Sequence, residues 1–205
     1  MKKQFLFLFL LTITSVSIAQ NRFLLGVKAG LSASQVSGDN LAGFNKAGLI
    51  GGLTLNTKFN NQWGAQLEML YIQKGSKAIN KPSDPNYEYY LLQLDYIEVP
   101  LLLQYHQKKF IFEAGPGFGY LVREKEYNAF DDITGIRPFN KSELAINLGV
   151  SYLLFNKFEI GWRYTNSISS IRNHVSGAKV WYNPGQQNTV MAFTLTYKFI
   201  SAKNE

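Results

Sequence analysis

Residues with catalytic chemistry are few in this sequence, and their spacing forms no recognisable site. The chain has no cysteine and two histidines, His106 and His174. His106 has no second ligand at the spacing of a metal site. His174 lies near Ser169, Ser170 and Ser176, and a histidine and a serine with a carboxylate can form the catalytic group of a lipid-modifying enzyme. Because serines are common in polar segments, we expect no enzymatic activity, no metal ion and no cofactor, and we keep the enzyme as an alternative.

Nine charged side chains follow a clearer pattern. They carry both signs and recur on the polar face of segments in which apolar and polar residues alternate. A charge removed from water is stable only when it is paired and hydrogen-bonded. We therefore predict a polar network of ion pairs and hydrogen bonds that fills the interior of the fold. Its predicted members are Lys28, Lys58, Glu68, Lys74, Glu98, Glu113, Glu159, Arg163 and Lys198.

The composition separates this chain from ordinary soluble domains and from nucleic-acid-binding proteins. Of its 205 residues, 15% are aromatic and 17% are charged, whereas soluble domains carry about 25% charged residues. The formal net charge is +7, but the basic residues are scattered, so we expect no nucleic-acid partner. After the first twenty residues, no apolar run reaches the roughly 18–20 residues that a membrane-spanning helix needs.

Residues 1–19 have the three parts of a secretory signal peptide. Two lysines begin the segment, an apolar core follows at 5–13, and Ser17 and Ala19 place small side chains just before the predicted cleavage site. A membrane anchor is the alternative, but the apolar core is too short to span a bilayer. We therefore expect an exported mature domain at 20–205.

Apolar and polar residues alternate along eight segments, as they do in β-strands with one apolar face. The last segment is the clearest, with Phe193 and Leu195 on one face and Thr194 and Thr196 on the other. The predicted strands span residues 25–34, 49–59, 65–74, 96–105, 110–122, 143–152, 158–165 and 189–199.

The fourth strand contains an irregularity. Leu92 and Leu94 lie in the opposite register to the apolar face that Ile97 and Val99 begin. A β-bulge inserts one extra residue and exchanges the two faces of a strand. A bulge near Asp95 would therefore reconcile the two registers.

Short and long connections alternate between these strands. The connections at 60–62, 107–109 and 156–157 are short, and the others are long and polar. This alternation predicts an antiparallel up-and-down meander with all the long loops at one end. In outer-membrane barrels the short turns are periplasmic and the long loops extracellular, so we expect both termini in the periplasm. The predicted outer loops are 35–46, 76–89, 123–141 and 171–188.

The direction of the apolar face distinguishes a membrane barrel from a soluble one. A soluble periplasmic barrel, the alternative, would fill its interior with the apolar face. The polar face here is rich in glycine and carries mixed charges, which suits a narrow, filled lumen. We therefore predict an all-β, eight-stranded transmembrane β-barrel in the outer membrane. Aromatic rings with a polar edge prefer the membrane interface. The predicted aromatic girdle consists of Trp63, Tyr71, Tyr105, Tyr120, Tyr152, Trp162, Tyr164 and Tyr197.

Four segments resemble the porin-like outer-membrane β-barrel domain family of Gram-negative bacteria. They are residues 26–31 (GVKAGL), 96–103 (YIEVPLLL), 115–119 (GPGFG) and 195–199 (LTYKF). The resemblance spans the mature chain, and it implies that the barrel-assembly machinery of the outer membrane recognises the last strand. One difference is that residues 200–205 extend past the terminal aromatic side chain.

These features predict a structural or interaction scaffold in the outer membrane. Lipid would surround the barrel, and an extracellular ligand would bind at the outer loops, where function is usually carried. The porin-like family implies a small-solute channel, which is the alternative, although eight strands leave little open space in a lumen.

Overall fold

The computed structural model describes residues 23–39, 41, 43–78, 89–155, 157–173 and 185–199. The predicted signal peptide at 1–19 lies outside the described residues, and so do His174, Ser176 and parts of the predicted loops at 76–89 and 171–188. Within the described residues, no helix is long and apolar enough to cross a membrane.

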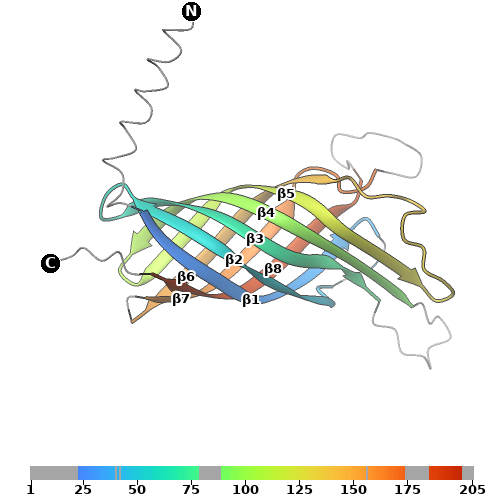
Figure 1. Ribbon diagram of the computed structural model, residues 1–205, viewed down its shortest axis with the longest axis horizontal. Helices are drawn as coiled ribbons and strands as arrows, with labels where there is room; N and C mark the ends of the chain where they lie inside the picture. The colour runs from blue at the N-terminus through green and yellow to red at the C-terminus, as the bar shows by residue number, and fades with distance from the viewer. Residues whose placement is uncertain are drawn as a thin grey trace, which may run out of the picture.

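The described residues form one antiparallel sheet of eight strands that closes into a barrel (Figure 1). Each strand pairs with the next one in the chain, and β1 pairs with β8 to close the barrel. The predicted number of strands and their up-and-down order are therefore confirmed. The strands are β1 (Phe23–Ser37), β2 (Lys46–Lys58), β3 (Trp63–Lys77), β4 (Tyr90–Gln107), β5 (Phe110–Asn128), β6 (Ser142–Leu154), β7 (Phe158–Ser167) and β8 (Gln187–Lys198).

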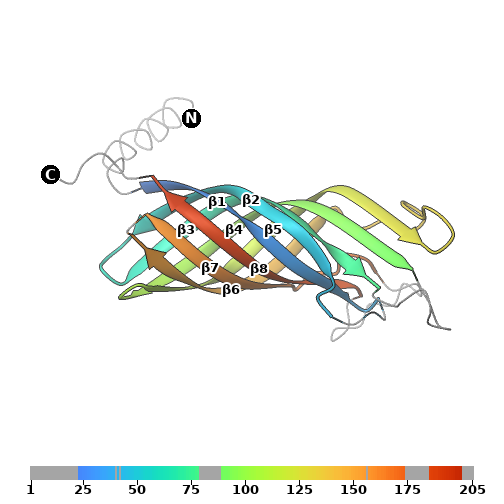
Figure 2. The same cartoon turned by 90° about the horizontal axis from the view of Figure 1, so that it is seen from below.

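The two ends of the barrel differ in the length of their connections. Short turns join β2 to β3, β4 to β5 and β6 to β7, and we call this the short-turn end. The longer connections lie at the opposite end, which we call the long-loop end. β1 begins and β8 ends at the short-turn end (Figures 1 and 2). This arrangement is the predicted meander.

The strands β4 and β5 are the longest, with 18 and 19 residues, and they project beyond their neighbours at the long-loop end (Figure 1). The register between them shifts at the predicted irregularity, because Asp95 pairs with Arg123 while Tyr96 pairs with Leu121. Val122 is the extra residue, so the bulge belongs to β5 and not to β4.

Leu92 and Leu94 stay on the inner face of β4, which corrects the expectation that a bulge would bring them into register with the apolar outer face. Both side chains are fully buried, at 0% exposure. The register of β4 with β3 is unbroken here, with Leu94 opposite Lys74 and Leu92 opposite Ser76. The two leucines join an inner apolar cluster within the barrel. This cluster consists of Val36, Ile50, Leu70, Ile72, Leu92, Leu94, Tyr96, Leu121, Phe139, Ile171, Val190 and Ala192.

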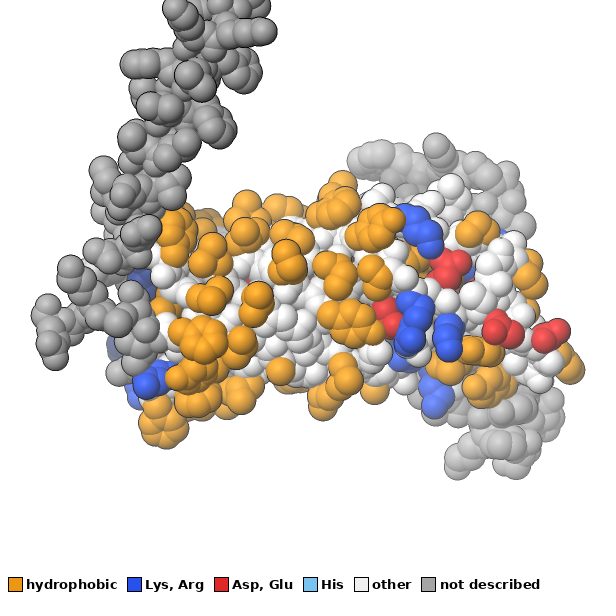
Figure 3. All heavy atoms as spheres, in the orientation of Figure 1, with side chains coloured by type: hydrophobic (Ala, Val, Ile, Leu, Met, Phe, Trp, Pro, Cys, Tyr) orange, Lys and Arg blue, Asp and Glu red, His pale blue; other side chains and the backbone are white. Residues whose placement is uncertain are grey.

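The outer face of the barrel is apolar (Figure 3). Side chains such as Leu31, Met69, Leu101 and Phe193 alternate with buried residues along their strands and are exposed. On the face that Figure 3 shows, exposed charged side chains gather toward the ends of the barrel. A soluble barrel has the inverse arrangement, whereas an apolar outer band is the property of a barrel surrounded by lipid.

Candidate functional site

Arg163 on β7 is the centre of the first ion-pair cluster inside the barrel. Its Nη1 and Nη2 atoms lie 2.5 Å from Glu68 Oε2 on β3 and 2.5 Å from Glu113 Oε1 on β5. Lys28 Nζ on β1 lies 2.5 Å from Glu68 Oε1, and Gln104 Nε2 on β4 donates to Glu113 at 3.5 Å. All five side chains are buried. Because its members come from five strands, this cluster joins opposite walls of the barrel.

Lys74 on β3 is the centre of a second cluster, nearer to the long-loop end. Its Nζ atom lies 3.1 Å from Glu143 Oε1 and also pairs with Glu98. Asn188 Nδ2 donates to Glu143 Oε2 at 3.1 Å, and the Ser167 hydroxyl donates to the same carboxylate. Glu143 was not predicted as a network member, although it lies on the polar face at the start of its segment.

In addition to these two clusters, a separate ion pair between Lys198 and Glu159 is buried near the short-turn end. Every predicted network residue except Lys58 is therefore buried and ion-paired among the described residues. Lys58 is exposed at the last position of β2, because a side chain at the open end of the barrel reaches water. Its assignment to the buried network is wrong.

The inner apolar cluster surrounds Lys74 and continues to the long-loop end, since its member Leu70 lies nearer to the short turns than Lys74 does on β3. Leu94 is opposite Lys74 in the β3–β4 ladder, and Leu92 lies one step farther from the short turns. Tyr96 belongs to the cluster and has its ring 4.9 Å from Lys74 Nζ. The alternation of the sequence predicted a polar interior along the whole barrel, so these buried apolar side chains were not predicted.

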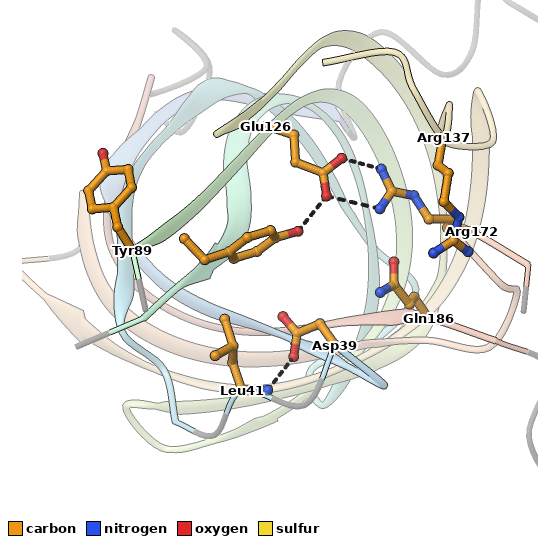
Figure 4. Close-up of a pocket in the computed structure, with 8 residues that line it drawn as sticks. Asp39, Leu41, Tyr89, Glu126, Arg137, Arg172 and Gln186 are labelled. Atoms are coloured by element: carbon orange, nitrogen blue, oxygen red, sulfur yellow. Dashed lines mark hydrogen bonds and ion pairs between the residues drawn. The ribbon is translucent and has the colours of Figure 1, made fainter. Parts of the chain in front are cut away.

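The long-loop end carries a further buried ion pair above the apolar layer (Figure 4). Arg172 donates to the two carboxylate oxygens of Glu126 at 3.0 and 2.5 Å, and the Tyr90 hydroxyl donates to Glu126 at 2.6 Å. The Arg172 guanidinium also lies 3.6 Å from the centroid of the Phe139 ring. Burial raises the pKa of Glu126, but the hydrogen bonds from Arg172 and Tyr90 outweigh it and hold the pKa below its usual value.

The aromatic residues predicted as a girdle occupy two regions of the outer face. Trp63 and Tyr105 are in contact at the short-turn end, with ring centroids 5.0 Å apart. Tyr152 and Tyr197 lie at the same end, against Phe110 at 5.1 Å and Phe158 at 5.0 Å, two phenylalanines that the prediction did not include. The four other predicted members lie farther along their strands from the short turns. They are Tyr71, Tyr120, Trp162 and Tyr164. Their role at a membrane interface stays a prediction.

The described residues do not assemble a catalytic or metal-binding group. No cluster of three or more His, Cys, Asp or Glu side chains that could hold a metal ion occurs among them. The Ser170 hydroxyl donates to the carbonyl of Arg172 at 2.8 Å, and Ser169 Oγ accepts from the Leu144 amide at 2.8 Å. His174, which the enzyme alternative requires, lies outside the described residues. The two serines therefore act here as local structural groups.

Comparison with known proteins identifies the family. Residues 18–173, which include β1 to β7, match the model of the outer membrane protein beta-barrel domain. A search of curated proteins gave no match. Matches to solved structures of the same architecture cover most of this chain and nearly all of the matched chain. Their sequence identities are low, so they show the fold alone.

Three of these structures are small outer-membrane barrels. Neisserial surface protein A is 14% identical with a TM-score of 0.52, and the match covers 85% of this chain and 97% of that chain. Ail of Yersinia pestis is 14% identical with a TM-score of 0.49, covering 87% and 99%. OprG of Pseudomonas aeruginosa is 16% identical with a TM-score of 0.41, covering 88% and 98%. From the match to the family model over most of its length, the chain belongs to the family of outer-membrane proteins with a β-barrel domain.

Proposed function

We propose that this protein is a non-conducting scaffold of the outer membrane that holds its long loops at the cell surface. The filled lumen is the observation that supports the proposal. Buried ion pairs occupy the barrel at the levels of Arg163 and Lys74, and the inner apolar cluster packs around Lys74 and continues to the long-loop end. An apolar layer opposes the passage of ions and polar solutes, because it offers no replacement for their hydration.

A small-solute channel is the alternative function. A channel needs a continuous polar path between the two ends of its lumen. Leu92, Leu94 and Ile171 are each fully buried and pack in the apolar layer that would have to open along such a path. The ion pairs inside the barrel also join opposite walls, so opening the lumen would separate buried charges at a high cost in free energy.

We expect the purified protein to give no steady current in a planar lipid bilayer. The measurement should use the full mature chain, and a mock preparation from cells that lack the gene controls for contaminating channels. Reproducible single-channel openings that appear with the protein and are absent from the mock preparation would contradict the closed lumen and favour the channel.

The orientation of the barrel is part of the same proposal. We place the long-loop end outside the cell and both termini in the periplasm, as is usual for outer-membrane barrels. The loops are then the accessible binding surface, and the short turns face the periplasm.

Cysteine labelling tests this orientation, because the natural chain has no cysteine. Asp131→Cys places a thiol in an exposed loop at the long-loop end, and Asn61→Cys places one in the exposed turn between β2 and β3. On intact cells, a bulky maleimide reagent that cannot cross the outer membrane should label the Asp131→Cys variant only. The Asn61→Cys variant should react after the membrane is permeabilised. The reverse order of labelling would invert the assignment.

A further inference from the structure

A pocket opens at the long-loop end of the barrel (Figure 4). Its volume is about 300 Å³. Each long connection, or the strand end next to it, supplies residues that line the pocket. In Figure 4, the side chains of Asp39, Glu126, Arg172 and Gln186 point toward the centre of the barrel mouth, and Tyr89 stands at its edge. The lining residues are Asp39, Leu41, Tyr89, Tyr90, Glu126, Arg137, Arg172 and Gln186.

The pocket is closed toward the barrel interior. Tyr90 lines it and packs against the inner apolar cluster, and Arg172 lies over the ring of Phe139, a member of that cluster. The Glu126 carboxylate is held from both sides by Arg172 and Tyr90. A molecule that enters from the long-loop end therefore meets a fixed floor and has no polar route onward, which suits binding better than transport.

Three polar atoms of the pocket-lining residues have no hydrogen-bond partner in the described structure. They are Asp39 Oδ2, Arg172 Nε and Gln186 Oε1. The other oxygen of the Asp39 carboxylate accepts a hydrogen bond from the Leu41 amide at 2.9 Å. Burial raises the pKa of Asp39, and hydrogen bonds from Ser76 and Leu41 offset only part of this rise. Arg172 is more than nine-tenths buried. Buried polar atoms are nearly always satisfied in native proteins, so these unsatisfied groups point to a missing partner.

The charges and the unpaired atoms together restrict the chemistry of that partner. Two acids, Asp39 and Glu126, balance two bases, Arg137 and Arg172, so the pocket has no net charge to attract an anion or a cation. Two of the unpaired atoms accept hydrogen bonds and one donates. A carboxylate or phosphate cannot donate to the acceptors, and an ammonium group cannot accept from the donor, whereas a hydroxyl group does both.

We propose that this pocket binds a neutral sugar, and this assignment rests on the proposed function that places the long-loop end outside the cell. Adjacent sugar hydroxyls match the mixed acceptors and donor of Asp39, Gln186 and Arg172. The Tyr89 ring, 40% exposed, and the Leu41 side chain give apolar surfaces for the C–H faces of the sugar. The unpaired oxygens of Asp39 and Gln186 have almost no exposed surface, so in this proposal the two half-buried side chains rotate to present them to the ligand.

Saturation-transfer NMR on the full mature chain in lipid nanodiscs tests this assignment, with lactose, maltose and N,N′-diacetylchitobiose as the neutral probes. Lactose sulfate and glucosamine serve as the matched anionic and cationic probes. At least one neutral sugar should bind more tightly than both charged probes. Asp39→Asn keeps the oxygen that accepts from Leu41 and replaces Oδ2 by a donor, so it should weaken binding by about tenfold, the effect of losing one charge-assisted hydrogen bond.

Asp131→Asn is the matched control, because it makes the same chemical change on an exposed loop residue that does not line the pocket. It should leave sugar binding unchanged. Three results would overturn the assignment: no response to any neutral probe, stronger binding of a charged probe, or equal binding by the Asp39→Asn variant and the wild type. None of them affects the conductance and labelling results, so the scaffold proposal can stand if the sugar site fails.

Discussion

Replacing Arg163 by methionine should destabilise the folded barrel by about 3–5 kcal/mol, the usual cost of leaving buried charges without their partner. Arg163 is the group that joins Glu68 on one side to Glu113 on the other, at 2.5 Å in each case. Without it, Glu113 keeps one long hydrogen bond from Gln104, and Glu68 keeps Lys28. Methionine fills a similar volume, so the loss is mainly electrostatic.

The measurement is the free energy of unfolding by urea in lipid vesicles, followed by tryptophan fluorescence and by heat-modifiable migration on a gel. Lys141→Met is the control, because it removes a cation whose side chain is 60% exposed and 3.6 Å from Glu124. That change should cost at most about 1 kcal/mol, the usual upper range for a surface ion pair. Glu113→Gln in the Arg163→Met background should recover part of the loss. Equal stability of the Arg163→Met and Lys141→Met variants would show that the buried network does not stabilise the barrel.

The strands and their faces could be predicted from the sequence because both are local properties. Successive side chains of a strand point to opposite faces, so the pattern at Phe193, Thr194 and Leu195 determines which residues share a face without any knowledge of the partner strand. Charged residues on the polar face, such as Glu68 and Arg163, must then lie inside the barrel, because its outer face is apolar. The alternation of short and long connections then predicted the up-and-down order of the strands.

The contacts between strands could not be predicted in the same way. Glu68 and Arg163 are 95 residues apart, and their contact depends on the register of every strand between them. The pairing of Glu143 with Lys74, 69 residues away, could not be predicted for the same reason, although the alternation already places Glu143 on the polar face of its segment. The pair of Glu126 and Arg172 was missed because both lie beyond the strand boundaries that the sequence indicated.

Leu92 and Leu94 illustrate a different limit. Their apolar side chains were assigned to the outer face because the rest of the barrel has its apolar residues there. The long-loop ends of β4 and β5 extend past their neighbours, and there the inner face packs against Phe139 and Ile171 from the connections themselves. An apolar inner layer is therefore possible where loops cover the barrel mouth, and alternation alone cannot distinguish it from a change of register.

The filled lumen and the pocket have a common structural consequence. Ion pairs that join opposite walls keep the barrel in one shape, and the apolar layer holds Tyr90 and Arg172 in position from below. A binding site assembled from separate loops needs this kind of support, because its side chains must hold their positions to favour one ligand. The stability of the barrel and the geometry of its mouth are thus linked.

Replacing Gly52 by alanine should destabilise the barrel by about 3 kcal/mol, the upper part of the usual range for overpacking. A Cβ atom at Gly52 would lie 2.0 Å from the carbonyl oxygen of Met69 and 2.9 Å from Leu70 Cα, both backbone atoms of the neighbouring strand β3. No side-chain rotation can relieve such a contact, so β2 and β3 would have to move apart and weaken their hydrogen-bond ladder. Urea unfolding in vesicles measures the loss.

The adjacent glycine supplies the control for this prediction. A Cβ atom at Gly51 would lie 3.5 Å from its nearest neighbour, the Lys28 carbonyl oxygen, which is an ordinary contact. Gly51→Ala should therefore leave stability unchanged or raise it by up to about 1 kcal/mol, because alanine restricts the unfolded chain. The two substitutions make the same chemical change at consecutive positions and differ only in the face of the strand. Equal effects would mean that close strand packing on the inner face does not govern the choice of glycine there.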